Sequence, residues 1–353
     1  MSLRDDLIAR ISQSGPISLA TYMAEALLHP TKGYYTTRDP LGTSGDFTTA
    51  PEISQMFGEL IGLCLAQTWL DQGAPDRFTL AELGPGRGTL MADILRATRS
   101  VPGFHAAAHV TLLEASPVLR AQQAATLAGS NPAWHRSVTD LPDGPLWLVA
   151  NEFFDALPIH QFARAGHGWR ERYVGVNDGA LTLGLGAPAP QAALARRMDD
   201  TNDGDIVETC PAAISVLQEV SGRIAIHGGA ALIIDYGDWR SLGDTLQAVQ
   251  DHTPVDPFAT PGQADLTAHV DFEALAGAAA PAAHSRVTPQ GVFLERLGIT
   301  ARAQALAQNL NGEALDAHIA AHRRLTHPEE MGNLFKVLGL FPADAAPPPG
   351  LNT

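Results

Sequence analysis

The segment Glu82-Leu83-Gly84-Pro85-Gly86-Arg87-Gly88 has residue types and spacing that suggest chemistry. It follows an apolar run at residues 78–83, which predicts a buried strand, and it leads into a predicted helix from Thr89. Glycines let the backbone approach a ligand closely, and the first turn of a helix offers free N–H groups. The loop therefore predicts a nucleotide-like ligand, with a ligand-free glycine turn as the alternative.

An acid at the end of the next strand narrows the identity of that ligand. Glu114 closes a predicted strand at residues 109–114, where a carboxylate can accept hydrogen bonds from both hydroxyls of a ribose. Dinucleotide enzymes share such an acid, but their glycines follow G-x-G-x-x-G, and the spacing here is G-x-G-x-G. An acid two residues before the first glycine, here Glu82, is typical of methyltransferases. We predict S-adenosylmethionine as the cofactor, with a nicotinamide or flavin as the alternative. The predicted cofactor-binding residues of this region are Glu82, Gly84, Pro85, Gly86, Gly88, Thr89 and Glu114.

Polar and aromatic residues follow two further apolar strands. The segment Asn151 to Pro158 follows the predicted strand 146–150, and Asp235-Tyr236 ends the strand 230–235. In a doubly wound sheet, the carboxyl ends of the strands face the ligand crevice. Loops whose side chains only pack are the alternative in both places. The predicted catalytic residues are Glu152, Asn151 and Asp155, with Asn151 also at the cofactor, and the predicted substrate-binding residues are Phe153, Phe154, Asp235 and Tyr236.

A loop near the N-terminus is expected to cover the cofactor. Its residues Gly45, Asp46 and Phe47 precede a helix entry at Pro51. Asp46 could hold an ammonium group, and Phe47 could shield a sulfonium. The histidines lack carboxylate or cysteine neighbours at metal-ligand spacing, so no metal site is predicted.

The elements that position these residues predict an α/β fold. Short apolar strands alternate with helices, as in a class I methyltransferase (Rossmann-like) fold with a mostly parallel sheet covered on both faces. We expect residues 1–75 to form a helical N-terminal region with the cofactor-covering loop. Residues 76–340 form the methyltransferase domain, in which 158–228 are a β-rich and helical insertion, and the proline-rich residues 341–353 are a disordered tail.

Composition limits the partners and the location. The 353 residues carry a formal net charge of −15, which argues against general nucleic-acid binding. The sequence has no uninterrupted apolar segment long enough to predict a membrane helix. It also has no recognisable signal or transit segment, so we expect a cytoplasmic location. Apolar residues on the β-rich insertion leave both a monomer and a homodimer open.

Several motifs together resemble the MidA family of class I methyltransferase-fold proteins. The matching stretches include Gly33 to Thr36, Gly45 to Ser54, Glu82 to Thr89, Asn151 to Pro158, Gly228 to Gly237 and Asp265 to Phe272. The resemblance implies binding of S-adenosylmethionine. It also implies a place for Ser137 and Val138 beside the adenine, where the family often has an acid in place of Ser137. For the mitochondrial members it implies symmetric dimethylation of an arginine in the 49-kDa-type subunit of respiratory complex I.

An arginine acceptor gives the acidic loop a chemical role. A guanidinium stays protonated near neutral pH, so its site needs carboxylates that pair with the fork and localise charge away from the attacking nitrogen. We expect Glu152 to do this, with Asp155 or Asp46 as its partner. Two alternatives stay open: a methyltransferase acting on a small molecule or another protein side chain, and a non-catalytic chaperone that binds S-adenosylmethionine.

Overall fold

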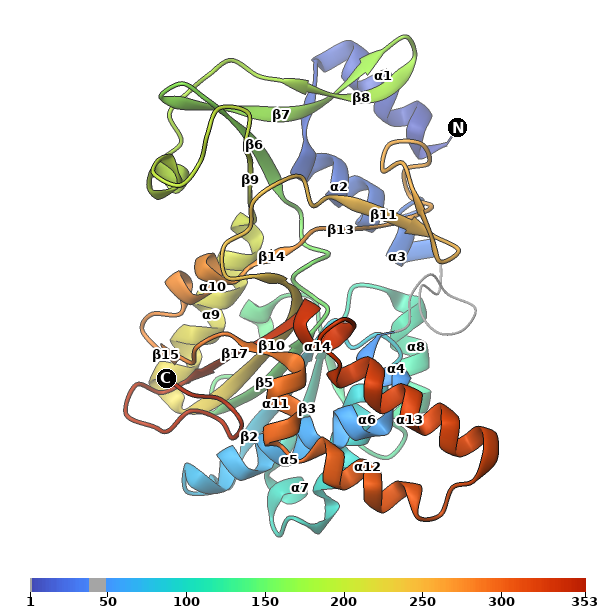
Figure 1. Cartoon of the computed structure of the whole chain (residues 1–353), viewed down its shortest axis with the longest axis vertical. Helices are drawn as coiled ribbons and strands as arrows, with labels where there is room; N and C mark the ends of the chain where they lie inside the picture. The colour runs from blue at the N-terminus through green and yellow to red at the C-terminus, as the bar shows by residue number, and fades with distance from the viewer. Residues whose placement is uncertain (1, 38–48) are drawn as a thin grey trace.

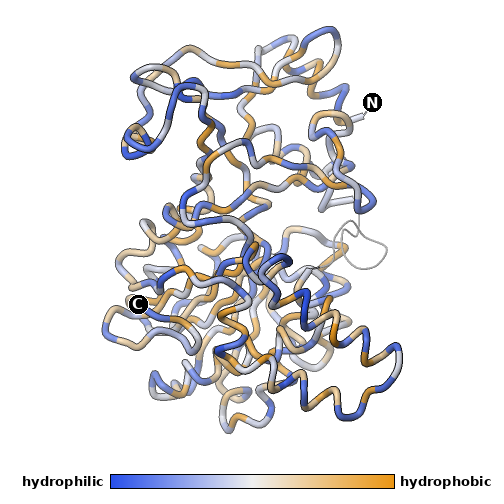
Figure 2. Tube along the Cα trace, in the orientation of Figure 1, coloured by the Kyte–Doolittle hydropathy of each residue, from blue (hydrophilic) through white to orange (hydrophobic). Residues whose placement is uncertain are grey.

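The computed structural model describes residues 2–37 and 49–353, which fold into two stacked lobes (Figure 1). The lower lobe contains a large sheet with helices on both faces, and the upper lobe contains two small sheets and the N-terminal helices. Figure 2 shows that hydrophobic residues gather along the central strands of the lower lobe and hydrophilic ones at its periphery. Among the described residues, no helix is both long and apolar enough to cross a membrane.

The large sheet follows the order β15-β17-β10-β5-β2-β3-β4. Neighbouring strands from β10 to β4 are parallel, whereas β17 pairs antiparallel with β10. This arrangement is the predicted mostly parallel sheet. The strands on this path are β2 (Phe78–Leu83), β3 (Ala108–Leu113), β4 (Ala133–His135), β5 (Leu146–Asn151), β10 (Gly229–Asp238), β15 (Ala283–His284) and β17 (Phe335–Phe341); the short β14 (Val270–Asp271) pairs with β10, and β16 (Thr288–Pro289) pairs with β17.

Alternating residues of the strands feed two cores, one on each face of the sheet. Leu80, Trp147 and Leu232 pack with one group of helices, and their neighbours Ala81, Leu148 and Ile233 pack with another. Because both faces are covered, the central strands are apolar throughout. The first group includes α5 (Gln55–Asp71), α6 (Thr89–Ala97), α11 (Gln290–Arg296), α12 (Ile299–Ala307) and α13 (Gly312–Thr326), and the second α9 (Pro211–His227) and α10 (Phe272–Ala278). The remaining helices of this lobe are α4 (Ala50–Ile53), α7 (Phe104–Ala107), α8 (Pro117–Thr126) and α14 (Met331–Leu334).

The upper lobe is assembled from three separate segments of the chain. The N-terminal segment supplies α1 (Leu3–Ser14), β1 (Ile17–Ser18), α2 (Leu19–Leu28) and α3 (Tyr34–Thr37). The second segment supplies β6 (His160–Ala165), β7 (Gly168–Asn177), β8 (Ala180–Leu185) and β9 (Ile206–Thr209), and β1 pairs with β7. The third supplies β11 (Gln247–Gln250), β12 (Thr253–Val255) and β13 (Asp265–Thr267). One hydrophobic core joins all three segments.

These boundaries differ from the sequence expectation in two places. The predicted insertion ran to residue 228, but its last helix, α9, packs on the large sheet through Leu217 and Ile224, so the β-rich part ends with β9. The third segment was not predicted as a separate insertion. Its strands contain three or four residues each, too few for a readable alternation of apolar and polar residues.

The expectation of a disordered tail is contradicted by the structure. Leu351 is buried in the core beside α5 and α11, and its Cδ1 lies against Gly339 of β17. The backbone N–H of Arg286 donates to the carbonyl of Asn352 over 2.7 Å. Proline-rich composition suggested disorder, but one large apolar side chain and these backbone contacts hold the segment in place.

Candidate active site between the two lobes

A cavity of about 420 Å³ lies where the two lobes meet. It brings together the glycine loop, the ends of β3 and β5, and parts of α2, α3 and β13. Most of the predicted site residues line it, namely Glu82, Gly84, Pro85, Gly86, Thr89, Glu114, Ser137, Val138, Asn151, Glu152, Phe153, Asp155 and Tyr236.

Left-handed glycines shape the loop after β2. Gly84, Gly86 and Gly88 have φ values of 61°, 54° and 82°, which residues with a side chain rarely adopt. A Cβ on Gly84 would lie only 3.0 Å from Cδ2 of Phe153, so the loop also touches the segment after β5. Gly88 forms the N-cap of α6 and does not line the cavity, so its role is to turn the chain into the helix.

Glu82 is a buried acid whose side chain faces the cavity. The side chain is 3% exposed, and Oε2 has no hydrogen-bond partner within the described residues. Burial raises the pKa of Glu82 to about 8, with a further contribution from Glu114, although a backbone N–H at Met91 opposes the shift. A buried carboxyl group with an unused oxygen is suited to a donor from a bound cation or hydroxyl.

Glu114 is oriented by a hydrogen-bond relay at the end of β3. Its Oε1 accepts from the backbone N–H of Ser116 at 2.7 Å, and its Oε2 accepts from Nε2 of Gln123 at 3.1 Å. The same Nε2 donates to the carbonyl of Gly86 at 2.7 Å, which ties Glu114 to the glycine loop. Ser137 and Val138 also line the cavity, as do Arg136, Ala115 and Leu119, which were not assigned from the sequence.

Glu152 sits at the first position after β5 in a strained backbone conformation. Its φ is 52°, in the left-handed region, which is uncommon for a residue with a side chain. Its Oε1 accepts from Nδ2 of Asn151 at 3.0 Å and from the backbone N–H of Ala50 at 3.2 Å. Burial, with the charge of Asp155, raises the pKa of Glu152 to about 7. Strained residues collect at functional sites, so this geometry supports a role for the side chain.

Asn151 and Asp155 each present an unused acceptor. Oδ1 of Asn151 and Oδ1 of Asp155 are buried and lack a hydrogen-bond partner among residues 2–37 and 49–353. Burial raises the pKa of Asp155 to about 6, although the nearby hydroxyl of Tyr236 opposes this shift. The segment after β5 therefore offers acceptors to a ligand that brings its own donors.

The structure places two predicted substrate-binding residues away from the cavity wall. Asp235 is fully buried, and its Oδ2 accepts from the backbone N–H groups of Phe153, Phe154 and Asp155 at 3.2, 2.9 and 3.3 Å. Burial and two neighbouring carboxyl groups raise the pKa of Asp235. Phe154 is 3% exposed and packs in the core next to α9. Asp235 thus positions the loop, and Phe154 anchors it; neither of these two residues lines the cavity.

Three residues of the upper lobe complete the site and were not assigned from the sequence. Tyr35, Asp265 and Thr267 line the cavity, and the hydroxyl of Tyr35 donates to Oδ1 of Asp265 at 2.8 Å. These residues belong to motifs that carry the family resemblance, but only folding brings them to the carboxyl ends of the parallel strands. Gly45, Asp46 and Phe47 lie outside the described residues; the adjoining Glu52 accepts from Oγ1 of Thr89 at 2.6 Å.

The cavity fits S-adenosylmethionine by its donor and acceptor chemistry. The unused oxygen of Glu82 suits an ammonium group, and the carboxylate of Glu114 at the neighbouring strand end suits the ribose hydroxyls. The described residues contain no cluster of three or more His, Cys, Asp or Glu side chains arranged to hold a metal ion.

Comparisons with known proteins support S-adenosylmethionine as the cofactor. The model of the S-adenosyl-L-methionine-dependent methyltransferase family Methyltransf_28 matches residues 60–290. The chain is 38% identical to the protein arginine methyltransferase NDUFAF7, mitochondrial, of Rattus norvegicus, over 95% of this chain and 83% of that one. It is 36% identical to the homologue in Drosophila melanogaster, over 97% and 85% of the two chains.

A solved structure supports the family and its cofactor, and the names of these relatives bear on the location in the cell. A Burkholderia thailandensis protein, solved with bound S-adenosyl-homocysteine, is 30% identical, has a TM-score of 0.81 and matches over 97% of this chain and 92% of that one. The relatives are named as mitochondrial proteins and point to mitochondria, so the expected cytoplasmic location is wrong. The resemblance noted in the sequence is confirmed, because the family match and these relatives cover most of the chain. The chain belongs to this family of S-adenosyl-L-methionine-dependent methyltransferases.

Proposed function

We propose that this enzyme methylates an arginine side chain of a protein, and that the acceptor is the 49-kDa-type subunit of respiratory complex I during assembly. The observation that carries the arginine assignment is the presence of three further carboxyl groups in the cavity besides those suited to the cofactor: Glu152, Asp155 and Asp265. A guanidinium is a planar cation with five N–H donors, so it requires this kind of wall. The names of the relatives as protein arginine methyltransferases support the class, and the MidA resemblance supports the subunit.

The cavity contains residues suited to the cofactor and others suited to the acceptor, and this arrangement suggests how the reaction proceeds. S-adenosylmethionine bound at the glycine loop supplies an electrophilic methyl group. Glu152 lines the same cavity directly after β5, and its carboxylate can pair with one edge of the guanidinium. The nitrogen that receives the methyl group must lose one proton. Because the pKa of Glu152 is raised to about 7, its carboxylate is able to accept that proton near neutral pH.

Asn151 and Asp235 hold Glu152 for this step. Nδ2 of Asn151 donates to the Glu152 carboxylate, which leaves Oδ1 of Asn151 to accept from the substrate. Asp235 fixes the backbone of the three residues that follow Glu152. Methyl transfer depends mainly on the position of the nucleophile, so this support contributes directly to the rate.

The test is Glu152→Gln, which keeps the side-chain volume and removes the charge. With the 49-kDa-type subunit purified from a deletion strain as acceptor, we expect the methylation rate to fall about 100-fold. Binding of S-adenosylhomocysteine, measured by calorimetry, should stay within about twofold of the unchanged protein, because Glu152 acts on the acceptor.

Two control variants frame the result. Glu313→Gln makes the same change on the exposed first turn of α13 and should leave the rate unchanged. Gly86→Val should abolish cofactor binding, because valine does not fit a φ of 54°. A Glu152→Gln protein with the normal rate would overturn the role of Glu152. An arginine that remains methylated in the deletion strain would overturn the acceptor, leaving another methylation substrate or a chaperone.

A further inference from the structure

The acceptor side of the cavity contains two tyrosine–aspartate pairs, one from each lobe. The hydroxyl of Tyr35 in α3 donates to Oδ1 of Asp265 in β13, at 2.8 Å. Tyr236, at the end of β10, lies near Asp155, and its hydroxyl opposes the rise in the pKa of that carboxyl group. Both pairs line the cavity, so the junction between the lobes has a carboxyl group on each side.

The two pairs lie close enough to share an electrostatic environment. Burial, together with the negative charges of Asp265 and Asp155, raises the pKa of Tyr35. Asp155 is 6% exposed, and its Oδ1 has no partner within the part of the chain that the structure describes. Tyr35 and Asp265 therefore lie near Oδ1 of Asp155, an acceptor that is available to a donor from the substrate.

The backbone of the third upper-lobe segment fixes Asp265 relative to the segment after β5, which contains Glu152 and Asp155. The N–H of Ala268 donates to the carbonyl of Asp155 at 2.9 Å, which joins β13 to the segment after β5. The N–H of His269 donates to Oγ1 of Thr245 at 2.8 Å. Asp265 is thus carried by a strand whose end is hydrogen-bonded to the residues that follow Glu152.

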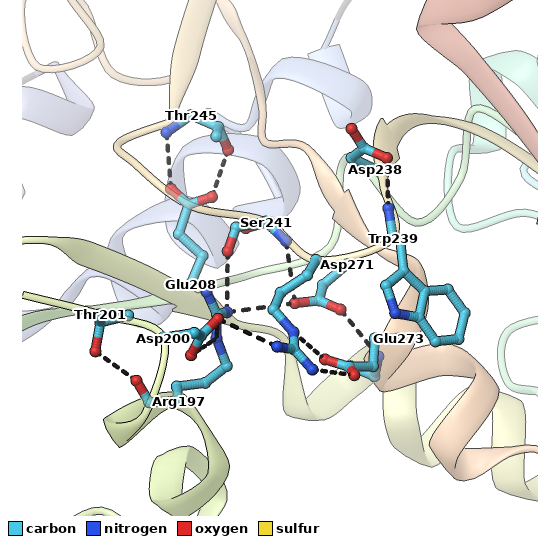
Figure 3. A network of polar contacts seen from close by, with 12 residues as sticks. Arg197, Asp200, Thr201, Glu208, Asp238, Trp239, Ser241, Thr245, Asp271 and Glu273 are labelled. Atoms are coloured by element: carbon cyan, nitrogen blue, oxygen red, sulfur yellow. Dashed lines mark hydrogen bonds and ion pairs between the residues drawn. The ribbon is translucent and has the colours of Figure 1, made fainter.

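Thr245 is in turn held by the polar network shown in Figure 3. Its backbone N–H and its hydroxyl both donate to the buried carboxyl group of Glu208 in β9. In the same network Arg197 donates to Asp200 and to the carbonyl of Ser241. These contacts connect the second and third upper-lobe segments, so the position of β13 is set by more than its own three residues.

A guanidinium needs acceptors on more than one of its edges. Asn151 and Glu152 are consecutive residues, so together they offer acceptors to one edge of the guanidinium. A lysine ammonium is a compact charge that a single cluster of acceptors satisfies, whereas the extended guanidinium fork reaches further. We propose that Asp265, oriented by Tyr35, is a second substrate-binding carboxylate that makes the site prefer arginine over lysine. This inference rests on the proposed arginine acceptor.

The test is Asp265→Asn in the full-length protein, with S-adenosylmethionine and the subunit from the deletion strain. We expect KM for the subunit to rise about tenfold, because one charged hydrogen-bond partner is lost. S-adenosylhomocysteine affinity should remain within about twofold, which also shows that the variant is folded. Asp178→Asn, an exposed residue at the turn between β7 and β8, is the matched control and should leave KM unchanged.

Small inhibitors measure the preference itself. Nα-acetyl-arginine amide should inhibit the unchanged enzyme more strongly than Nα-acetyl-lysine amide, and this ratio should shrink in Asp265→Asn. Tyr35→Phe should raise KM about threefold, and it carries the test if Asp265→Asn fails to bind S-adenosylhomocysteine. An unchanged KM and an unchanged inhibitor ratio in a folded variant would overturn the inference. If the unchanged enzyme does not methylate an arginine of the subunit, the proposed function itself fails.

Discussion

The buried carboxyl groups of Glu82, Glu152 and Asp155, which line the cavity, have pKa values raised to about 8, about 7 and about 6. Burial is the largest cause for each of them, since a buried carboxylate loses its contact with water. A bound cation would restore the charged form. The site is therefore prepared for positively charged ligands and is unfavourable when empty.

Glu82→Gln should make the ligand-free protein more stable at pH 8 and weaken its binding of the cofactor. Between pH 4.5 and about 8, the unfolded chain loses the Glu82 proton while the folded chain keeps it. The folded state is therefore progressively penalised as the pH rises through this range. Glutamine removes the penalty and retains an acceptor for the N–H of Met91.

Thermal unfolding without ligand checks this prediction. Glu82→Gln should raise Tm by at least about 2 °C at pH 8 and leave it nearly unchanged at pH 4.5. S-adenosylhomocysteine affinity at pH 8 should fall about tenfold. Equal stability gains at both pH values would show that the effect does not come from titration of Glu82.

At the scale of elements, the glycine loop after β2 touches the segment after β5, which contains the proposed catalytic residue Glu152. Gly84→Ala should destabilise the protein by about 1 kcal/mol through its left-handed backbone, and should also displace Phe153. Because Phe153 follows Glu152 directly, we expect both cofactor affinity and methylation rate to decrease.

Gly166→Ala is a control with the same backbone change and no contact. Gly166 has a φ of 59°, and a Cβ there would meet nothing within 4 Å. Denaturant unfolding should show a similar loss of stability for both variants, with normal activity only for Gly166→Ala. Loss of activity in both would mean that the strain alone, and not the contact with Phe153, accounts for the effect.

The elements with clear local signals were predictable from the sequence. The strand at Phe78–Leu83 and the helix from Thr89 are found where the pattern placed them. The predicted fold and cofactor are confirmed by the family match. Asp265 could not be placed, because its position depends on pairings such as Gly237 with Val270 between distant segments. The predicted roles of the individual site residues remain predictions.

At the scale of the whole molecule, both ends of the chain are part of the folded structure. Leu351→Ala should destabilise the protein by about 3 kcal/mol, because it leaves a hole in the core beside α5 and α11. Removal of residues 342–353 should lower Tm further, since it also removes the hydrogen bond between Arg286 and Asn352.

The measurement is thermal unfolding of both variants, beside a protein that lacks only the exposed Thr353 as control. Kinetic constants measured well below Tm should stay normal, because no residue of the tail lines the cavity. An unchanged Tm in the truncated protein would show that residues 342–353 do not contribute to stability.

The three-segment construction of the upper lobe has a consequence for the order in which the enzyme is made. The residues predicted to bind the cofactor end at Asn151, whereas Asp265 and Thr267 of β13, which also line the cavity, come much later in the chain. At about 5–20 residues per second, a ribosome adds Asp265 on the order of ten seconds after Glu152. A nascent chain therefore contains the residues predicted to bind the cofactor before it contains Asp265. Asp265 and Thr267 are the last residues of the cavity wall to be synthesised, so a nascent chain that ends before them lacks the second carboxylate of the proposed arginine site.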